Sequence, residues 1–261
     1  NQQPIFLHGV LDQGYFPKGI YVPEDAKDYE RDILYMKRLG FNCIRKHIKV
    51  ESESFYYDCD RLGMLVIQDM VNSGKYDFFA DTLLPYFQMQ KRADKKRLGL
   101  GQHRADEKER RHIFIEHTKQ TMIQLYNHPS VIIYTIFNEG WGQFESDKLY
   151  DMAKQIDRTR LIDSTSGWFP QQRSDFDSRH QYFKNRKIVP SSEKPILISE
   201  CGGYGLRKEN HLYFDEEDKI YQYGGCKDEK ELTDKIMKLY EEMILPGIEV
   251  GVCGCIYTQL S

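Results

Sequence analysis

Residues 131–141 read VIIYTIFNEGW, a run of β-branched and aromatic residues that ends in an amide and a carboxylate side by side. Such a run is typical of a strand that is buried on both faces, as the strands of parallel sheets are. An ionised carboxylate is costly to bury without partners. The stretch therefore predicts a parallel strand whose carboxyl end, at Asn138 and Glu139, opens on a working surface.

Strand-like runs alternate with helix-like patterns along the rest of the chain. Apolar side chains at a period of 3.6 residues predict helices at about residues 26–39, 109–126, 146–156 and 228–244. The predicted strands are residues 5–10, 42–47, 64–69, 131–138, 161–166, 178–182, 196–200 and 252–260. The links on either side of the strand at residues 178–182 are too short for a full helix.

Eight alternating strands in 261 residues predict an α/β fold and, more specifically, a closed (β/α)8 TIM barrel. An open, doubly wound sheet is the alternative, but no GxGxxG turn follows the first predicted strand. We expect residues 1–261 to form a single catalytic domain. Because the chain lacks an initiator methionine and begins almost inside a strand, we also expect it to be excised from a longer protein.

The composition narrows the class of protein. The net charge is −3, from 37 basic and 40 acidic residues, which gives no reason to expect a nucleic-acid partner. No apolar run reaches the length of a membrane span, and the opening residues do not resemble a signal peptide, so the compartment stays open. The six cysteines show no zinc-binding spacing and are predicted to be buried free thiols. The most charged stretch, residues 91–111, is predicted to be a solvated loop leading into a helix.

The carboxyl ends of the predicted strands carry an unusual set of side chains. In a parallel barrel, catalytic residues project from these ends. The polar and aromatic residues found there are Arg45, His47, Asp69, Asn138, Glu139, Trp141, Trp168, His180, Tyr182 and Glu200. A barrel with a purely structural role should not collect so many, so we expect them to line one shared pocket.

Two of these residues, Glu139 and Glu200, end the fourth and seventh predicted strands, which lie across a barrel from each other. Paired carboxylates that flank a pocket are the machinery of glycoside hydrolysis. One is kept protonated to donate to the leaving oxygen, and the other attacks the anomeric carbon or activates a water. Arg45 is expected to stabilise the charge of Glu200, and Trp141 and Trp168 would offer flat apolar faces to sugar rings.

With these residues in view, the chain resembles the catalytic (β/α)8 domain of glycoside hydrolase family 2, which includes β-galactosidases, β-glucuronidases and β-mannosidases. The most specific motif is NHPSVIIYTIFNEG (127–140), ahead of the strand-end glutamate of KPILISECGGYG (194–205). The other carriers are GFNCIRKH (40–47), FYYDCDRLGMLVIQD (55–69) and IDRTRLID (156–163). The resemblance runs from residue 6 to residue 259.

The resemblance implies a retaining glycosidase in which Glu139 is the acid/base and Glu200 is the nucleophile. It also implies that Asn138 binds the 2-hydroxyl group of the sugar and that Arg45 orients the nucleophile. His180 and Tyr182 match side chains that the family usually places near the sixth strand. The expected partners are a carbohydrate substrate and β-sandwich domains of the parent chain, and no cofactor or metal ion is required.

Two departures from the family pattern leave alternatives open. Arg45 and His47 are separated by one residue, where many members have two, and Cys201 stands where an aromatic residue often follows the nucleophile. A barrel that binds carbohydrate without cutting it is therefore the alternative function.

Other interpretations also remain. Metal-assisted hydrolysis could draw on His8, His47, Asp69 and His180, although their spacing is not diagnostic. The tryptophans, Asp69 and Asp163 could be structural, and the sugar is undecided. For a uronic acid, the lysines Lys46 and Lys49 are possible basic groups.

Overall fold

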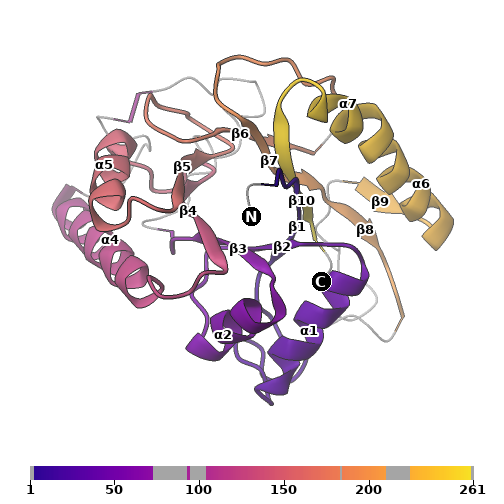
Figure 1. Cartoon of the computed structure of the whole chain (residues 1–261), viewed down its shortest axis with the longest axis horizontal. Coiled ribbons are helices and arrows are strands. Elements are labelled where there is room, and N and C mark those ends of the chain that lie inside the picture. Colours follow the sequence, from indigo (N-terminus) through magenta and orange to yellow (C-terminus); the bar gives the residue numbers. More distant parts are fainter. Residues whose placement is uncertain (1–2, 73–92, 95–103, 183, 210–223, 260–261) are drawn as a thin grey trace.

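The computed structural model describes residues 3–72, 93–94, 104–182, 184–209 and 224–259. Eight strands make one sheet: β1 (Leu7–Asp12), β2 (Cys43–Lys46), β3 (Leu65–Asp69), β4 (Val131–Asn138), β5 (Leu161–Ser166), β6 (Asp177–Gln181), β7 (Ile196–Gly202) and β10 (Val252–Thr258). Their order is β5-β4-β3-β2-β1-β10-β7-β6, and every pairing in it is parallel. The sheet curls into a nearly closed barrel with helices around its outside (Figure 1), so the predicted TIM barrel is confirmed.

The helices are α1 (Lys27–Arg38), α2 (Glu53–Leu62), α4 (Arg104–Gln124), α5 (Ser146–Ile156), α6 (Glu229–Leu239), a π-helical turn (Tyr240–Ile244) and α7 (Leu245–Ile248). Sequence periodicity did not predict α2, although Gly63, left-handed with φ of 66°, is a typical residue at the end of a helix. No helix appears between β5 and β6 or between β6 and β7 in the described part of those links, as predicted. None of the described helices is both long and apolar enough to cross a membrane.

Two layers of apolar side chains hold the barrel together. The inner layer fills the barrel with Leu7, Leu11, Cys43, Ile67, Ile133, Phe176, Leu197 and Ile256. The outer layer packs the other face of the strands against the helices, with residues such as Ile44, Val66 and Ile198. Because both faces are covered, the strands read as nearly continuous apolar runs.

The alternation of side chains along each strand carries this inner layer up to the site. Side chains two residues apart lie on the same face of a strand. Cys43 belongs to the inner layer, so Arg45 also points inward at the carboxyl end of β2. In the same way, Ile67 is followed on β3 by Asp69. The strand period therefore places a cation and a carboxylate above the apolar filling of the barrel.

The seam between β5 and β6 is closed mainly by side chains, since no strand ladder joins these two strands in the described residues. The Ser178 hydroxyl donates to Asp163 Oδ2 at 2.7 Å. Below it, the carboxylate of Asp175 accepts from the backbone N–H of Ile162 at 2.7 Å, and its own N–H donates to the Ile162 carbonyl at 2.9 Å. Hydrogen bonds of Ser178 on β6 and of Asp175 just before it thus connect β6 to β5.

Other expectations for the chain have mixed outcomes. All six cysteines are free, and four of them are buried, as predicted. Part of residues 91–111 lies outside the described residues, but the helix predicted from residue 109 already begins at Arg104. The prediction of a solvated loop is wrong at Asp94, which is 2% exposed and accepts hydrogen bonds from Gln143 and Ser146. The short strands β8 (Tyr204–Leu206) and β9 (Gly224–Cys226) were not predicted.

Replacing a residue of the inner layer should cost much more stability than replacing an exposed isoleucine. We expect Ile133→Ala to lower the free energy of unfolding by about 2–5 kcal/mol, because it leaves a cavity in a close-packed interior. The matched control is Ile123→Ala on α4, where the side chain is 59% exposed and a change within about 0.5 kcal/mol is expected. Urea denaturation measures both, and equal losses for the two variants would contradict the two-layer description.

Candidate active site

The guanidinium group of Arg45 joins four strand ends at the carboxyl end of the barrel. Its Nε and Nη2 donate to the two oxygens of Asp69, both at 3.0 Å. Nη2 also donates to Asn138 Oδ1 at 2.9 Å, and Nη1 donates to the Ser199 carbonyl at 2.9 Å and to Glu200 Oε1 at 3.1 Å. All five N–H groups of Arg45 are therefore used within the protein.

Arg45 is fully buried, yet its surroundings keep it charged. Burial acts to lower the pKa of its guanidinium, but the charges of Asp69 and Glu200 outweigh burial and raise the pKa above its ordinary value. A buried cation is tolerated only where ion pairs and hydrogen bonds satisfy it. The cation thus fixes the relative positions of the side chains that end β2, β3, β4 and β7.

Glu200 lies within this network and is 4% exposed. Its Oε1 accepts from Arg45, and His47 Nε2 lies 3.7 Å from the same oxygen. Its Oε2 accepts from the hydroxyl of Tyr182. Burial, followed by the charges of Glu200 and Glu139, raises the pKa of Tyr182 well above its ordinary value, so the phenol remains a donor. Glu200 is therefore surrounded by groups that stabilise a negative charge.

Glu139 follows β4 in an uncommon backbone conformation. Its φ is 52°, in the left-handed region that residues other than glycine rarely adopt. Neighbouring side chains of a strand normally face opposite sides. The left-handed turn at Glu139 breaks that alternation, so its carboxylate reaches the same site as the amide of Asn138. A strained residue of this kind often marks a functional site.

The surroundings of Glu139 favour its protonated form. Its side chain is 29% exposed, and Oε1 lies 2.8 Å from His180 Nδ1. Burial raises the pKa of this carboxyl, and the charges of His47 and Arg45 oppose the shift only in part. The direct partner of Glu139 is thus the imidazole ring of His180, whereas the direct partner of Glu200 is the cation Arg45. The two carboxyl groups therefore differ in the charge of the group that they contact.

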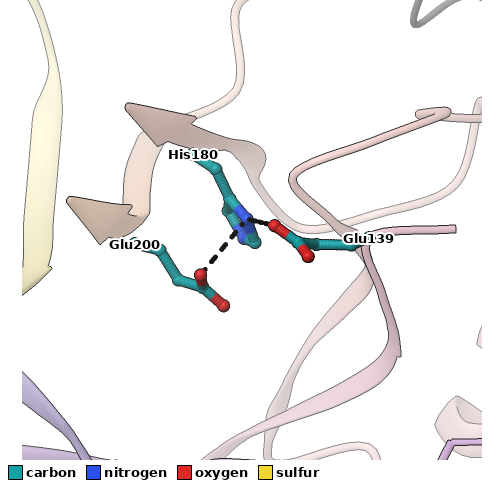
Figure 2. Close-up of side chains that lie close together, drawn as sticks. All are labelled: Glu139, His180 and Glu200. Atoms are coloured by element: carbon teal, nitrogen blue, oxygen red, sulfur yellow. Dashed lines mark hydrogen bonds and ion pairs between the residues drawn. The ribbon is translucent and has the colours of Figure 1, made fainter. Parts of the chain in front are cut away.

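His180, on β6, lies between the two carboxyl groups (Figure 2). Its Nδ1 is 2.8 Å from Glu139 Oε1 and 3.5 Å from Glu200 Oε2, and its Nε2 is 3.0 Å from the Ser166 hydroxyl. Burial lowers the pKa of His180 to about 4, so the ring is neutral at neutral pH. Gly167 makes room for this ring: its φ is 84°, and a Cβ there would lie 2.7 Å from His180.

Glu139, His180 and Glu200 are also the one group of three potential metal ligands found in the described part of the chain, with ligand atoms within 4.8 Å of one another. Both oxygens of Glu200 already accept hydrogen bonds, and Glu139 already contacts His180. The donors at this place are therefore engaged with one another. The sequence suggested His8, His47, Asp69 and His180 as metal ligands. The structure does not bring these four together, because the His8 ring contacts the Gly40 carbonyl and the Tyr240 hydroxyl instead.

The remaining predicted site residues lie around this centre. His47 is close to Asn138, with 3.3 Å between its Nε2 and the amide Nδ2. Trp168 packs against His180 at 5.3 Å between ring centroids, and it is partly buried. Trp141 lies in the turn after β4, where its backbone N–H donates to the Asn138 carbonyl at 3.1 Å. Sequence reasoning missed Ser166, Ser178 and Ser199, since short polar residues on strands carry no distinctive spacing.

The two lysines considered as a basic clamp are engaged with partners within the protein. Lys46 is 1% exposed and pairs with Asp12 at 2.6 Å and Glu51 at 2.9 Å. Lys49 pairs with Glu51 at 2.7 Å and donates to the Gly14 and Tyr21 carbonyls. These contacts hold the segment after β2 that carries His47, and they leave neither ammonium group free to bind a ligand.

Comparison with known proteins identifies the family of this chain. The family model described as "Glycosyl hydrolases family 2, TIM barrel domain" matches residues 1–212. A β-galactosidase of Kluyveromyces lactis is 26% identical over an alignment of 244 residues that covers 86% of this chain and 23% of that protein. A β-galactosidase of Leuconostoc mesenteroides is 27% identical over 168 residues, or 64% of this chain and 14% of that protein.

Solved structures share the fold. A GH2 β-galacturonidase from Eisenbergiella tayi, bound to galacturonate, superposes with a TM-score of 0.62 at 18% identity over 98% of this chain and 44% of its own. A Bacteroides uniformis β-glucuronidase gives 0.63 at 17% identity, over 98% of this chain and 30% of its own. The chain thus spans less than half the length of these relatives. On the family match over residues 1–212, the chain belongs to glycoside hydrolase family 2 and carries its TIM barrel domain.

Proposed function

We propose that the protein is a retaining β-glycosidase with Glu200 as nucleophile and Glu139 as acid/base. The observation that carries this proposal is the proximity of the two carboxyl groups, since one oxygen of Glu139 lies within 4.8 Å of one oxygen of Glu200. Retaining enzymes hold their carboxyl groups about 5–5.5 Å apart, whereas inverting enzymes need about 6.5–9.5 Å to admit a water. The short spacing favours direct attack on the sugar.

The first step of the proposed reaction forms a covalent glycosyl-enzyme. An oxygen of Glu200 attacks the anomeric carbon while Glu139 gives its proton to the leaving glycosidic oxygen, so the C–O bond to the leaving group breaks. In the second step the Glu139 carboxylate takes a proton from water, which attacks the same carbon and releases Glu200. The contrast between a carboxyl beside Arg45 and one beside neutral His180 supports these separate roles.

The side-chain amide of Asn138 is oriented by its hydrogen bond from Arg45. Arg45 donates to its Oδ1, which fixes the amide so that Nδ2 is the end that faces His47. We propose that this N–H donates to the 2-hydroxyl group of the sugar. Arg45 and Asp69 position Asn138 and Glu200, while Trp168 and Trp141 supply apolar faces for sugar rings.

The substrate class we favour is a neutral β-hexoside, because the Kluyveromyces lactis and Leuconostoc mesenteroides relatives described above are named β-galactosidases. A uronide substrate needs a cation for its carboxylate. Arg45 in the site and the lysines Lys46 and Lys49 are each engaged with protein partners. Further domains of the parent protein stay a prediction.

The nucleophile assignment predicts a severe loss in Glu200→Gln. Removing a carboxylate that forms the covalent intermediate should lower kcat by about 10³-fold or more. The measurement is hydrolysis of nitrophenyl β-galactoside, β-glucoside, β-mannoside and β-glucuronide. The matched control, Glu193→Gln, changes an exposed residue before the same strand and should keep full activity. Undiminished hydrolysis by Glu200→Gln would remove this assignment, and sugar binding by the unaltered protein without turnover would favour the carbohydrate-binding barrel.

The acid/base assignment predicts that the loss in Glu139→Gln depends on the leaving group. Substrates with poor leaving groups should lose about 10²–10⁴-fold in kcat/KM, while dinitrophenyl glycosides, which need no proton, should keep most of it. Because the rate falls as rising pH removes the Glu139 proton, the alkaline limb of the pH profile should disappear in Glu139→Gln. An equal loss for both kinds of substrate, or an unchanged alkaline limb, would contradict the role of Glu139.

A further inference from the structure

The segment that carries the acid/base candidate has an unusual backbone. Four residues between the end of β4 and the start of α5 have positive φ, namely Glu139 at 52°, Gly140 at 71°, Gly142 at 71° and Glu145 at 39°. This conformation is costly for the two glutamates, and such strain persists only where the surrounding structure imposes it. The segment, which we call the acid/base loop (residues 139–146), therefore depends on the contacts around it.

Asp94 makes buried contacts with the far end of the acid/base loop. It is 2% exposed, and its Oδ2 accepts from Ser146 N at 3.0 Å, from Ser146 Oγ at 2.6 Å and from Gln143 Nε2 at 3.0 Å. Its backbone carbonyl accepts from the N–H of Glu145 at 3.1 Å. Four hydrogen bonds thus join Asp94, on the link that runs from β3 to α4, to residues 143–146.

Gln143 extends these contacts to the backbone beside Glu139. Its Nε2 also donates to the carbonyl of Phe169 at 3.0 Å, and its backbone N–H donates to the Gly140 carbonyl at 3.0 Å. Phe169 follows β5 and is fully buried, and its ring lies so close to Gly140 that a Cβ there would clash with it. The contacts that begin at Asp94 therefore reach Gly140, the residue next to Glu139.

We propose that Asp94 is a positioning residue, which holds the acid/base loop in the backbone conformation that aims Glu139 at His180. It acts through Gln143 and Ser146. The contact that depends on the loop is the one of 2.8 Å between Glu139 Oε1 and His180 Nδ1. The proposal rests on the proposed function, because that function assigns the role of acid/base to Glu139.

The position of Glu139 matters because a general acid must lie within hydrogen-bond reach of the leaving oxygen. A displacement of about 1 Å, caused by a change far from the chemistry, can lower a rate by about 10²-fold. Loss of the contacts of Asp94 would let the left-handed turn relax, and the carboxyl group would then leave its place beside His180.

A merely structural role for Asp94 is the competing explanation, because a carboxylate that accepts from Ser146 N also stabilises the N-terminus of α5. Such a role predicts lower stability, and any effect on hydrolysis should be the same for every substrate. The positioning role predicts a loss that depends on the leaving group, because a poor leaving group needs the Glu139 proton and a good one does not.

The chain offers two test variants and a matched control. Asp94→Ala removes the acceptor of three hydrogen bonds, and Gln143→Met removes an amide while the two bonds from Ser146 to Asp94 stay. The control is Asp157→Ala at the other end of α5. Asp157 is also fully buried, and it accepts from the N–H and the hydroxyl of Thr159 at 2.8 and 2.6 Å.

The first readout, in the full protein, is the dependence of kcat/KM on the leaving group. Asp94→Ala should lower kcat/KM for poor leaving groups by about 10²-fold, while dinitrophenyl glycosides should change much less. Gln143→Met should show the same selectivity with a smaller loss, and Asp157→Ala should leave the ratio between the two kinds of substrate unchanged. Combined with Glu139→Gln, which has no proton to place, Asp94→Ala should add no further selectivity.

The second readout needs no activity. The chain has two tryptophans, Trp141 within the acid/base loop and Trp168 next to Phe169, so the fluorescence of the folded protein reports on this place. Asp94→Ala should shift the emission to longer wavelength and increase its quenching by acrylamide. Asp157→Ala should change neither.

The two readouts separate this proposal from the proposed function. Altered fluorescence in Asp94→Ala, in a protein whose unaltered form hydrolyses no glycoside, would support the hold of Asp94 on the loop and overturn the proposed function. Hydrolysis by the unaltered protein, with an equal loss for both kinds of substrate in Asp94→Ala and Gln143→Met, would overturn the positioning role alone. If Asp94→Ala does not fold, Gln143→Met decides by the same criterion.

Discussion

The buried charge of Arg45 is the constraint on which the site depends. A guanidinium with no exposed surface is tolerated only because all five of its N–H groups donate hydrogen bonds. The acceptors are Asp69, Glu200, Asn138 and the Ser199 carbonyl. These partners come from three other strands, so the cation couples the carboxyl ends of the barrel into one rigid unit. Removing Arg45 would leave two buried carboxylates without compensation, and geometry and stability would be lost together.

The same cation separates the two glutamates by environment. Glu200 is bound directly to Arg45 and Tyr182, whereas the direct partner of Glu139 is a histidine that burial keeps neutral. Hydrogen-bond donors thus stabilise a negative charge on Glu200, while burial raises the pKa of Glu139. The left-handed backbone at Glu139 brings one of its carboxyl oxygens within 4.8 Å of an oxygen of Glu200. The polar seam between β5 and β6, which closes the barrel, also contacts the ring between them.

Much of this arrangement could be predicted from the sequence, because strand periodicity and strand ends are local properties. The eight barrel strands and the meeting of Glu139 with Glu200 follow from them. The burial of Asp94 and the pairing of Lys46 and Lys49 could not be predicted, because a charged residue reads as solvated until its partner from a distant segment is known. The serines of the seam were missed for the same reason.

The central claim is that Glu200 forms a covalent bond to the sugar, and intact mass after reaction with 2-deoxy-2-fluoro β-glycosides tests it most directly. The fluorine slows both steps, and a good leaving group allows the first to proceed, so the intermediate accumulates. We expect the mass to rise by one fluoroglycosyl group and peptide mapping to place it on Glu200. Hydrolysis of natural substrates with no adduct, or with an adduct on another residue, would contradict the assignment.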